Sequence, residues 1–540
     1  MPLKFLEGVT RTRFEATLPD LLKAQRWFGG KAREVAATQI VDRIPIPAEH
    51  MEFLLLFLYV TYRDGGGETY ALPLAFAFGE EARRISRDMP RAVLSSLAAD
   101  DTEDHPEGLL YDAMWNPFAV QTLLRAIGHG AQFAGENGTL QASSTTAYET
   151  FVPSHGLGTP RVLSAEQSNT SVAFGEQAIL KLYRRVQPGV NPDWEIGRYL
   201  TSRGFPHSPA VGGAIEYVRP GETSTVALLQ AFVRNQGDAW AAMLKDVDGF
   251  LRRASAHTLP IDSEGGTAAS LWDLARSPLS GPGRELIGPA LEAAGCLGRR
   301  TAALHLVLAE AQDHPDFAPE ALTLEYRQAR YQSMLRMWKQ VARLLTQRLV
   351  GGTQSQQQAA DLLAQESRLL AVFETFLDLQ HGGQRIRCHG DYHLGQVLWT
   401  GSDYVLTDFE GEPDRPLYER RLKHSPLYDV AGMLRSFDYA SWTALNKCDV
   451  EDTQHKLESW VAYWSRWVRA RFLGEYLTQM HDAPFWPPSS KDAEQLLTVH
   501  ELEKAVYELG YELNNRPEWV GIPLKGIHEI VRRSGARTAA

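Results

Sequence analysis

Apolar residues follow two different patterns along the chain, and the change divides it into a strand-rich part and a helical part. The segments EFLLLFLYVTY and ETYALPLAFAF flank RDGGG, which is typical of a β-hairpin. SVAFGEQAILKLYRR predicts two short strands that turn at Gly175-Glu176, and TVALLQAFV predicts another buried strand. After Ala239 the pattern is mostly helical, with one long amphipathic helix expected over Leu322–Leu349. The sequence therefore predicts an α+β protein.

The length of the chain and these patterns predict three regions. A chain of 540 residues is too long for one ordinary core. We expect a small α+β unit over residues 1–95, in which Leu21–Arg33 forms a helix ended by Gly29-Gly30. A strand-rich intermediate region should cover residues 96–234, and a larger helical lobe should cover residues 235–540.

Composition narrows the classes of protein to consider. The formal net charge of −11 argues against general binding to nucleic acids or acidic membranes. Cys296, Cys388 and Cys448 are far apart and form no CxxC, which argues against a zinc site or a disulfide framework and agrees with a reducing cytoplasm. The first 20 residues carry charges where a signal peptide needs an apolar core. The most apolar run, Phe53–Val60, is too short to span a bilayer. We therefore expect a cytoplasmic protein.

One stretch, RCHGDYHLGQVLWTGSDYVLTDFEG (Arg387–Gly411), concentrates residues suited to phosphoryl transfer. An Asp-to-amide spacing of five residues, Asp391 to Gln396, is that of a kinase catalytic loop, and Asp408 follows a predicted hairpin. Phosphoryl transfer needs a carboxylate that orients and deprotonates a hydroxyl, and oxygen ligands for Mg²⁺ on the nucleotide. The pattern assigns Asp391 to the first task and Gln396 and Asp408 to the second.

The neighbouring residues have two interpretations each. His389 is either a catalytic residue or shapes the loop by bonding to backbone, and His393 either packs behind the loop or contacts substrate. Glu410 either binds the metal or braces its loop. An HGD triplet alone is weak evidence for a catalytic site, because Asp after Gly is common in turns. The combination of HGD, the amide and DFE is what favours phosphoryl transfer.

A kinase also needs a cation on the nucleotide phosphates. Lys181 lies mid-strand in AILKLYR, and Glu195, on a predicted helix fourteen residues later, is its expected partner. No GxGxxG precedes this strand, so small polar residues would have to hold the phosphates. These residues are Ser168, Asn169, Thr170 and Ser171. The adenine-binding hinge is expected at Gln230, Phe232 and Val233.

Four segments resemble the bacterial maltokinases. They are Gln25–Arg33 (QRWFGGKAR), the HGDYHLGQVL loop, Asp408–Ala440 and Lys504–Leu524. The resemblance implies a bilobal, protein-kinase-like fold related to aminoglycoside phosphotransferases, with an N-terminal cap subdomain before the nucleotide-binding lobe. It also implies transfer of phosphate from ATP, with Mg²⁺, to the anomeric hydroxyl of maltose, giving maltose 1-phosphate. Such enzymes feed α-glucan synthesis alongside trehalose synthase, a possible partner. Tyr428 stands where Arg is more usual in this family.

The C-terminal motif predicts where a sugar would bind. On a helix, Leu502, Val506, Leu509 and Leu513 form one narrow apolar stripe. Tyr507 and Tyr511 fall roughly opposite and could stack on pyranose rings, with Arg516 and Trp519 following at the helix end. The alternative is a second core face buried by another domain. Arg420 is expected either in ion pairs that fix the loop or in contact with phosphate or sugar.

Three other classes of function compete with maltokinase. A related kinase for glucosamine or another sugar would share nearly the same catalytic core. A protein kinase is disfavoured, because GxGxxG and HRD patterns are missing from the sequence and no APE triplet follows the DFE segment. A non-enzymatic pseudokinase is disfavoured by the presence of Lys181, Asp391, Gln396 and Asp408 together. The sequence leaves open whether the chain is a monomer or a homodimer.

Overall fold

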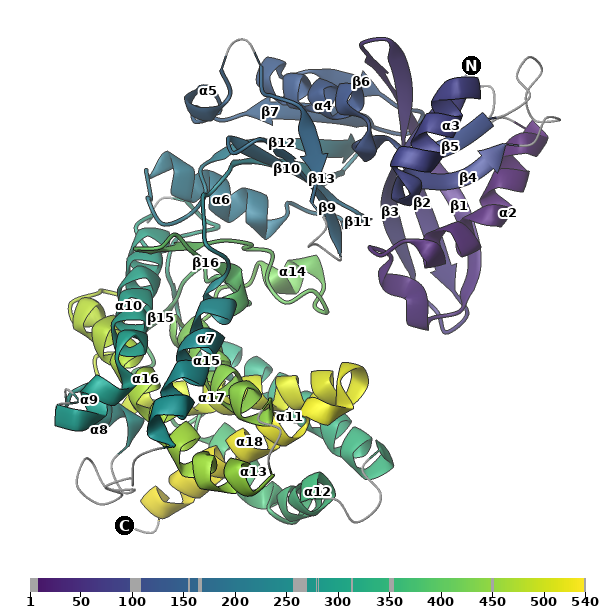
Figure 1. The fold of residues 1–540 in the computed structure, drawn as a ribbon. Coiled ribbons are helices and arrows are strands. Elements are labelled where there is room, and N and C mark those ends of the chain that lie inside the picture. The colour runs from purple at the N-terminus through teal and green to yellow at the C-terminus, as the bar shows by residue number, and fades with distance from the viewer. Residues whose placement is uncertain are drawn as a thin grey trace. The chain divides into compact units, whose positions relative to one another are not determined.

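The structure is a computed structural model that divides into two compact units. It describes residues 8–97, 108–153, 156–163, 168–255, 270–277, 279, 281–311, 314–348, 354–447 and 451–538. The first unit contains Met1–Arg234 and Pro416–Tyr418, and the second contains Asn235–Arg415 and Glu419–Ala540. Strands dominate the first unit and helices the second (Figure 1), so the predicted α+β class is confirmed.

A six-stranded antiparallel sheet begins the first unit. Its strands are β1 (Val35–Ala48), β2 (Met51–Tyr62), β3 (Gly67–Phe78), β4 (Val93–Leu97), β5 (Gly108–Asp112) and β11 (Arg185–Val186). The order is β1-β2-β3-β5-β4, with β11 added against β3. The predicted hairpin is formed by β2 and β3, and its turn uses Gly65 and Gly66 at φ 97° and 73°, which glycine adopts without strain. The sheet continues past residue 95, the expected end of the cap, because β5 pairs between β3 and β4.

Strand β2 is buried on both faces, which explains its uninterrupted apolar sequence. Phe53, Leu55 and Phe57 join one apolar cluster, whereas Leu54, Leu56 and Leu58 join another. Helix α2 (Gly8–Ala24) supplies Phe14 and Leu18 to the second cluster. Helices α3 (Gly79–Asp88) and α4 (Pro117–His129) supply side chains such as Ile85 and Leu123 to the first. Because successive side chains of a strand point to opposite faces, such a strand has no polar positions to alternate with.

The expected helix over Leu21–Arg33 is wrong in its extent. Helix α2 ends at Ala24, and a short 3₁₀ turn, η1, covers Gly29–Ala32. Trp27 and Phe28, between them, are buried in the same cluster as Leu54. A Cβ on Gly30 would lie 2.3 Å from the Tyr62 hydroxyl, so the chain passes too close to the sheet for another residue. The aromatic pair therefore turns the chain into the core before the helix can reach the glycines.

A seven-stranded sheet follows in the first unit. Its strands are β6 (Gln132–Ala134), β7 (Thr139–Ser144), β8 (Pro160–Val162), β9 (Asn169–Phe174), β10 (Ala178–Tyr183), β12 (Val211–Arg219) and β13 (Glu222–Ala231). Their order is β6-β7-β12-β13-β10-β9-β8, so the predicted hairpin β9–β10 lies beside β13. Helix α5 (Tyr148–Phe151) precedes β8, and α6 (Pro192–Ser202) packs against β12.

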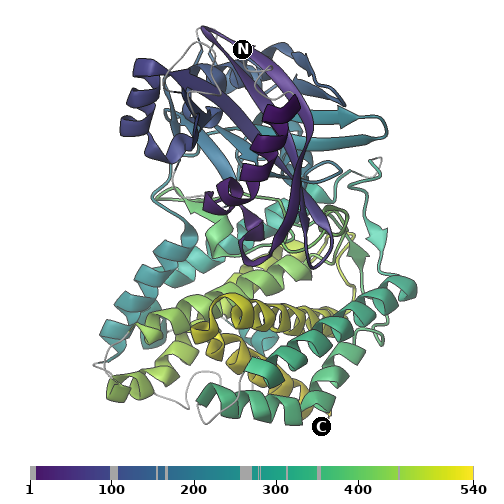
Figure 2. The same ribbon diagram turned by 90° about the vertical axis from the view of Figure 1, so that its right-hand side faces the viewer.

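The second unit is mainly helical (Figure 2). Its helices are α7 (Ala239–Ala254), α8 (Leu271–Ala275), α9 (Gly281–Ile287), α10 (Pro289–Leu308), α11 (Leu324–Arg348), α12 (Gln354–Ala364), α13 (Glu366–Glu374), α15 (Leu427–Asn446), α16 (Glu451–Met480), α17 (Ser490–Asn515) and α18 (Gly521–Thr538). Helix α11 is the long amphipathic helix predicted from the sequence. Helix α15 is buried along most of its length and contacts α7, α16 and α17.

Short elements complete the second unit. Strands β14 (Glu320–Ala321) and β15 (Gln384–Arg385) pair with each other, as do β16 (Val397–Trp399) and β17 (Tyr404–Leu406). The second pair is the hairpin predicted after Gln396. The short helix α14 (Leu417–Arg420) follows it in sequence, and its first two residues belong to the first unit. Among the described helices, none is both long enough and apolar enough to cross a membrane.

Candidate active site

The loop that carries Asp391 is anchored to helix α15 of the second unit. The backbone N–H groups of His389 and Gly390 donate to the two carboxylate oxygens of Asp429, at 2.7 and 3.0 Å. Asp429 is buried, and His305 Nε2 lies 3.1 Å from it. Burial alone would raise the pKa of Asp429, but the contact with His305 and other favourable interactions lower it. A buried carboxylate thus fixes the backbone immediately before Asp391.

His389 has a bracing position in this loop. Its ring is 1% exposed and lies against Tyr392 and Phe409, with centroid distances of 5.2 and 4.9 Å. Its Nε2 atom is 2.9 Å from the carbonyl oxygen of Thr407, to which it donates in the matching tautomer. This geometry ties the loop to the residue just before Asp408, which fits the interpretation of His389 as a residue that shapes the loop.

Gln396, Asp408 and Glu410 all belong to the segment around the β16–β17 hairpin. Gln396 ends the 3₁₀ turn η5 (Leu394–Gln396), and its carbonyl oxygen accepts the Thr407 N–H at 2.9 Å, which brings Asp408 one residue away. Asp408 has φ 64°, a left-handed conformation that few residues other than glycine adopt. Carboxylate and amide oxygens are the donors that Mg²⁺ prefers, so this set fits the expected ion.

Arg420 packs against the loop that carries Glu410 and Gly411. It donates to the Glu410 carbonyl oxygen at 3.2 Å, and its side chain is 6% exposed. A Cβ on Gly411 would lie 3.2 Å from the Cβ of Arg420, so the two pack closely. Of its two predicted roles, these contacts match the one in which Arg420 fixes the loop after the metal ligands.

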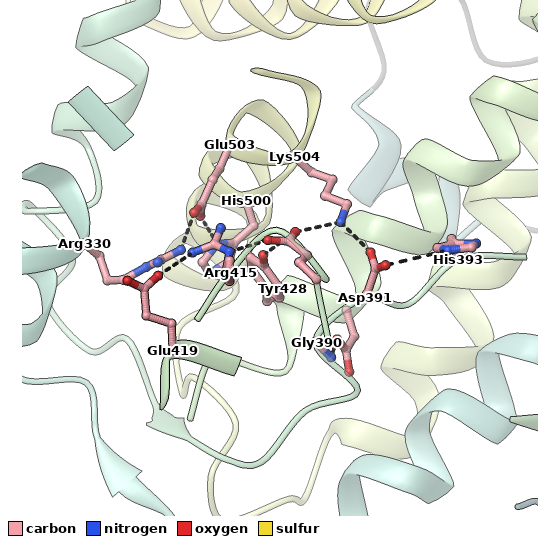
Figure 3. A network of polar contacts seen from close by, with 12 residues as sticks. Arg330, Gly390, Asp391, His393, Arg415, Glu419, Tyr428, His500, Glu503 and Lys504 are labelled. Carbon is pink, nitrogen blue, oxygen red and sulfur yellow. Dashed lines mark hydrogen bonds and ion pairs between the residues drawn. The ribbon is translucent and has the colours of Figure 1, made fainter. Parts of the chain in front are cut away.

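Lys504 of α17 lies against Asp391 (Figure 3). Its Nζ atom is 3.0 Å from Asp391 Oδ1 and 2.8 Å from Glu412 Oε1. Burial would raise the pKa of Asp391, but the ammonium of Lys504 and then His393 outweigh it, so the pKa is lowered. The same lysine, with Arg415, lowers the pKa of Glu412 to about 2 against the effect of burial. Asp391 is therefore held in its ionised form.

Further side chains extend this network, among them Tyr428, Arg415 and Arg330 (Figure 3). Glu412 accepts from the Tyr428 hydroxyl at 2.9 Å and from Arg415. Arg330 pairs with Glu503, the residue before Lys504. Tyr428, the position that departs from the usual Arg, therefore has a clear task, because its hydroxyl holds the carboxylate that holds Lys504.

A cavity of about 420 Å³ in the second unit opens onto Asp391. Its lining includes His393, Tyr507, Tyr511, Arg516 and Trp519, the residues that the sequence predicts around a sugar. Trp240 and Tyr439 add two more aromatic rings. The opposite stripe of α17 is core: Leu502, Val506, Leu509 and Leu513 are at most 2% exposed. We call this cavity the acceptor pocket.

Two further carboxylates line the acceptor pocket, and each has an arginine partner. Glu508 is 2.9 Å from Arg435 Nη2, and Glu512 is 2.7 Å from Arg516 Nη2. Glu512 also accepts from the Tyr439 hydroxyl at 3.3 Å. With Asp391 paired to Lys504, all three carboxylates of the lining carry a cation beside them. The pocket therefore presents hydrogen-bonding groups without a large excess of negative charge.

The predicted nucleotide residues lie in the first unit. Lys181 of β10 pairs with Asp193 at 3.2 Å, and the Tyr183 hydroxyl donates to the same carboxylate at 3.0 Å. Glu195, the expected partner, is buried two residues further along the same helix, α6. Ser171 lies opposite Lys181 on β9. The predicted hinge is the end of β13, where Gln230 pairs with Ile179 and the N–H of Phe232 donates to Gln177.

The predicted phosphate loop is described in part. Residues 164–167 lie outside the described residues, whereas Ser168 and the first residues of β9 lie inside. The Thr170 hydroxyl accepts from Arg184 Nε at 2.8 Å and is buried. Arg184 also pairs with Asp112 of β5 and stacks on Trp27, 4.7 Å from its ring centroid. The start of β9 is thereby tied to the cap sheet.

Comparison with known proteins agrees with this arrangement. Residues 21–115 match the family model of the maltokinase N-terminal cap domain. Over 95% of this chain, the fold superposes on a solved glucosamine kinase, in complex with glucosamine, ADP and inorganic phosphate, with a TM-score of 0.59 at 19% identity and 98% coverage of that protein. A crystal form of glucosamine kinase superposes with a TM-score of 0.60 at 19% identity, over 95% of this chain and 99% of that protein. The chain therefore combines a cap of the maltokinase type with a kinase-like fold.

Sequence relatives point the same way. The glucosamine kinase of Mycolicibacterium smegmatis is 25% identical over 67% of this chain and 77% of its own length. The glucosamine kinase of Streptacidiphilus jiangxiensis is 25% identical over 67% of this chain and 71% of its own length. The maltokinase-type cap and the kinase-like fold together support a phosphotransferase of the sugar kinase kind.

Several residues of the candidate site are not predicted from the sequence. Asp193 lies two residues before the chosen Glu195, and a choice between two acids on one short helix needs the structure. Lys504 begins the segment Lys504–Leu524 that resembles the maltokinases, but the sequence predicts no partner for its charge. Asp429 follows Tyr428, and a buried acid after a tyrosine carries no periodic signal. The one sequence sign for Lys504 is that Tyr507 and Tyr511 follow it at helical spacing, three and seven residues on.

Proposed function

We propose that this protein transfers the γ-phosphate of ATP to the anomeric hydroxyl of maltose, giving maltose 1-phosphate and ADP. The observation that carries the proposal is the acceptor pocket, whose lining combines five tyrosine and tryptophan rings with Asp391. Aromatic faces and a few polar groups are the usual lining for a sugar, since pyranose rings present apolar faces and a rim of hydroxyls.

The charges of the pocket favour a neutral sugar. Glu508 and Glu512 are already paired with Arg435 and Arg516, so a sugar ammonium would gain little from them. Tyr507 and Tyr511 lie one helical turn apart on α17, which suits rings that follow one another, as in a disaccharide. These features support maltose over a monosaccharide amine.

Asp391 is assigned as the base. It accepts the proton of the C1 hydroxyl while that oxygen attacks the γ-phosphorus and the bond to the ADP oxygen breaks. Lys504 keeps Asp391 ionised before the acceptor binds, and it also lines the acceptor pocket. His389 and Asp429 position the loop without contacting the sugar.

The nucleotide and its ion are assigned to the remaining predicted residues. Mg²⁺, held by Gln396, Asp408 and Glu410, would neutralise charge on the phosphates. In the first unit, Lys181 with Asp193 or Glu195 would hold the phosphates together with Ser168, Asn169 and Ser171. Gln230, Phe232 and Val233 would contact adenine. Thr170 is assigned to the same group, with its hydroxyl also accepting a hydrogen bond from Arg184.

Glucosamine is the second candidate acceptor, because the sequence relatives and the similar solved structures are glucosamine kinases. An ADP-release assay with maltose, glucose, trehalose and glucosamine at saturating Mg²⁺ and ATP separates the two. Turnover with maltose and little with glucosamine is expected. Turnover with an amino sugar alone would rule out maltokinase and favour the second candidate.

The metal assignment has an independent test. Asp408→Ala should remove the Mg²⁺-dependent part of nucleotide binding, because it deletes a carboxylate ligand. Calorimetric titration of ATP with and without Mg²⁺ measures this directly and needs no acceptor. Equal affinities in wild type and variant would contradict the role of Asp408. A working partnership with trehalose synthase remains a prediction, testable by co-purification from cells that express both proteins.

A further inference from the structure

A second cavity of the helical unit is rich in arginine. It has a volume of about 310 Å³ and lies among α15, α16 and α18. Four arginines and two acids line it: Arg466, Arg469, Arg532, Arg533, Asp438 and Glu529. Trp442 and Ser465 also line it. We call it the arginine cavity. Its volume is at the lower end of the range of about 300–1,000 Å³ that small-molecule sites occupy.

The acids of the arginine cavity are already engaged. Asp438, at its floor, accepts from Ser465, from Arg435 at 2.9 Å and from Arg469 at 3.3 Å. Glu529 lies 3.7 Å from Arg533 across one helical turn. Arg469 is 4% exposed and also pairs with Glu501, yet its Nε atom is buried with no hydrogen-bond partner among the described residues. The lining therefore has more cationic donors than its own acids satisfy.

The arginines also act on one another. Burial lowers the pKa of Arg466, and the positive charge of Arg533 lowers it further against the opposing effect of Glu529. Arg532 is exposed at the mouth of the cavity, so the charge continues to the surface. Such a concave, positive site attracts anions from solution.

We propose that the arginine cavity binds a phosphate monoester, a small phosphorylated metabolite, as a site separate from the acceptor pocket. The planar fork of a guanidinium matches two phosphate oxygens at once, which is why arginine clusters select phosphate. A phosphate monoester is close to a dianion at pH 7 and would bring negative charge to a lining in which four arginines face two acids. Trp442 offers an apolar face for the carbon part of the ligand.

The two cavities share one wall, α15. Asp438 lines the arginine cavity, and the next residue, Tyr439, lines the acceptor pocket. Arg435, one turn earlier, is 1% exposed and joins Asp438 to Glu508 of the acceptor pocket, with 2.9 Å on each side. An anion that draws Arg469 or Arg435 away from Asp438 changes the hold on Glu508. Occupancy of the arginine cavity should therefore alter the affinity for the acceptor, a linkage that rests on the proposed function, whereas the binding itself does not.

Binding is tested by calorimetric titration of the full chain with glycerol 3-phosphate and with inorganic phosphate, without nucleotide or sugar. Arg532→Gln, an exposed position, and the pair Arg466→Gln/Arg532→Gln should weaken binding about tenfold or more, with the thermal unfolding midpoint as a check on folding. Arg252→Gln, which removes a surface arginine of α7 in the same unit, is the matched control and should leave binding unchanged. Absence of saturable binding to wild type would overturn the proposal. So would binding that survives both arginine variants but disappears in Asp408→Ala.

The linkage has its own measurement. Glycerol 3-phosphate should change the KM for maltose in wild type and in Arg252→Gln, and should leave it unchanged in Arg466→Gln/Arg532→Gln. An identical wild-type KM with and without the probe, at a concentration that saturates the calorimetric signal, would overturn the linkage. A protein without kinase activity would defeat the proposed function, while the calorimetric result would still decide the site.

Discussion

Each unit of this protein contains a buried basic residue held by acids, but only one of the two lies beside a cavity with aromatic walls. In the first unit, Arg184 is 1% exposed and contacts Asp112, Thr170, the Ala71 carbonyl oxygen and the ring of Trp27. In the second unit, Lys504 contacts Asp391 and Glu412, and both Lys504 and Asp391 line the acceptor pocket.

The difference separates a structural ion pair from a functional one. Every contact of Arg184 named above goes to a group fixed in strand, turn or core, so the arginine joins the cap sheet to β9. Lys504 pairs with a carboxylate that lines the acceptor pocket, so Asp391 can interact with a bound hydroxyl. A perturbed pKa indicates function when its group lines a cavity, and the two networks allow this rule to be tested within one chain.

The largest effect is expected at Asp391. Asp391→Asn removes the base but keeps the size of the side chain, so kcat should fall by about 10²–10⁴ or more, with the fold intact. Steady-state ADP release with maltose measures the loss, and thermal unfolding checks the fold. Near-normal turnover would refute the assignment of Asp391 as the base. The pair of Lys504 and Asp391 could then no longer be called functional.

The next largest effect concerns stability. Asp112→Asn leaves the Arg184 guanidinium buried without its carboxylate, which should destabilise the first unit by about 3–5 kcal/mol. The unfolding midpoint by calorimetry measures this. Asp64→Asn is the matched control: Asp64 pairs with Arg33 in the same unit at 2.6 Å, but 61% of its side chain is exposed, so water replaces the pair with little effect. Equal midpoints for the two variants would show that Arg184 is not a structural anchor.

Local pattern was enough to predict the elements and the aromatic side of the site. The β2–β3 and β9–β10 hairpins follow from glycine turns between apolar runs, and the stripe on α17 places Tyr507 and Tyr511 opposite the core. The place of β5 in this sheet does not follow from local pattern, because β5 enters between two earlier strands and sequence spacing does not encode that order.

The buried charge pairs could not be predicted from the sequence for a related reason. Lys504 and Asp391 are 113 residues apart, and Arg184 and Asp112 are 72 apart. A charged residue inside an amphipathic segment usually means a solvated face, and only burial reveals otherwise. The same applies to Asp193 and Glu195, where both acids are buried on one helix and the contact with Lys181 depends on tertiary geometry.

Replacing Lys504 should move the pH dependence of the reaction. The ammonium lowers the pKa of Asp391, so Lys504→Met leaves burial and Glu412 to raise it. A base with a higher pKa is protonated at higher pH, and the acid limb of kcat/KM should therefore shift upward. A pH profile between 4 and 8 measures the shift. Lys525→Met, which breaks a pair with Glu458 away from the pocket, is the control and should keep the wild-type limb. An unchanged limb in Lys504→Met would contradict the electrostatic role of the lysine.

The smallest effect is expected at the outer end of the acceptor pocket. Tyr511 is 40% exposed and lies one turn beyond Tyr507, so its ring would cover the part of the sugar farthest from Asp391. Tyr511→Ala should raise the KM for maltose about two- to tenfold, the range expected from losing one aromatic contact of about 0.5–1.5 kcal/mol, with kcat nearly unchanged. Tyr511→Phe keeps the ring and should stay close to wild type. Since a monosaccharide would not reach this ring, the KM for any monosaccharide acceptor should be the same in all three proteins. A fall in kcat instead of a rise in KM would mean that Tyr511 acts on the reaction and not on the outer sugar.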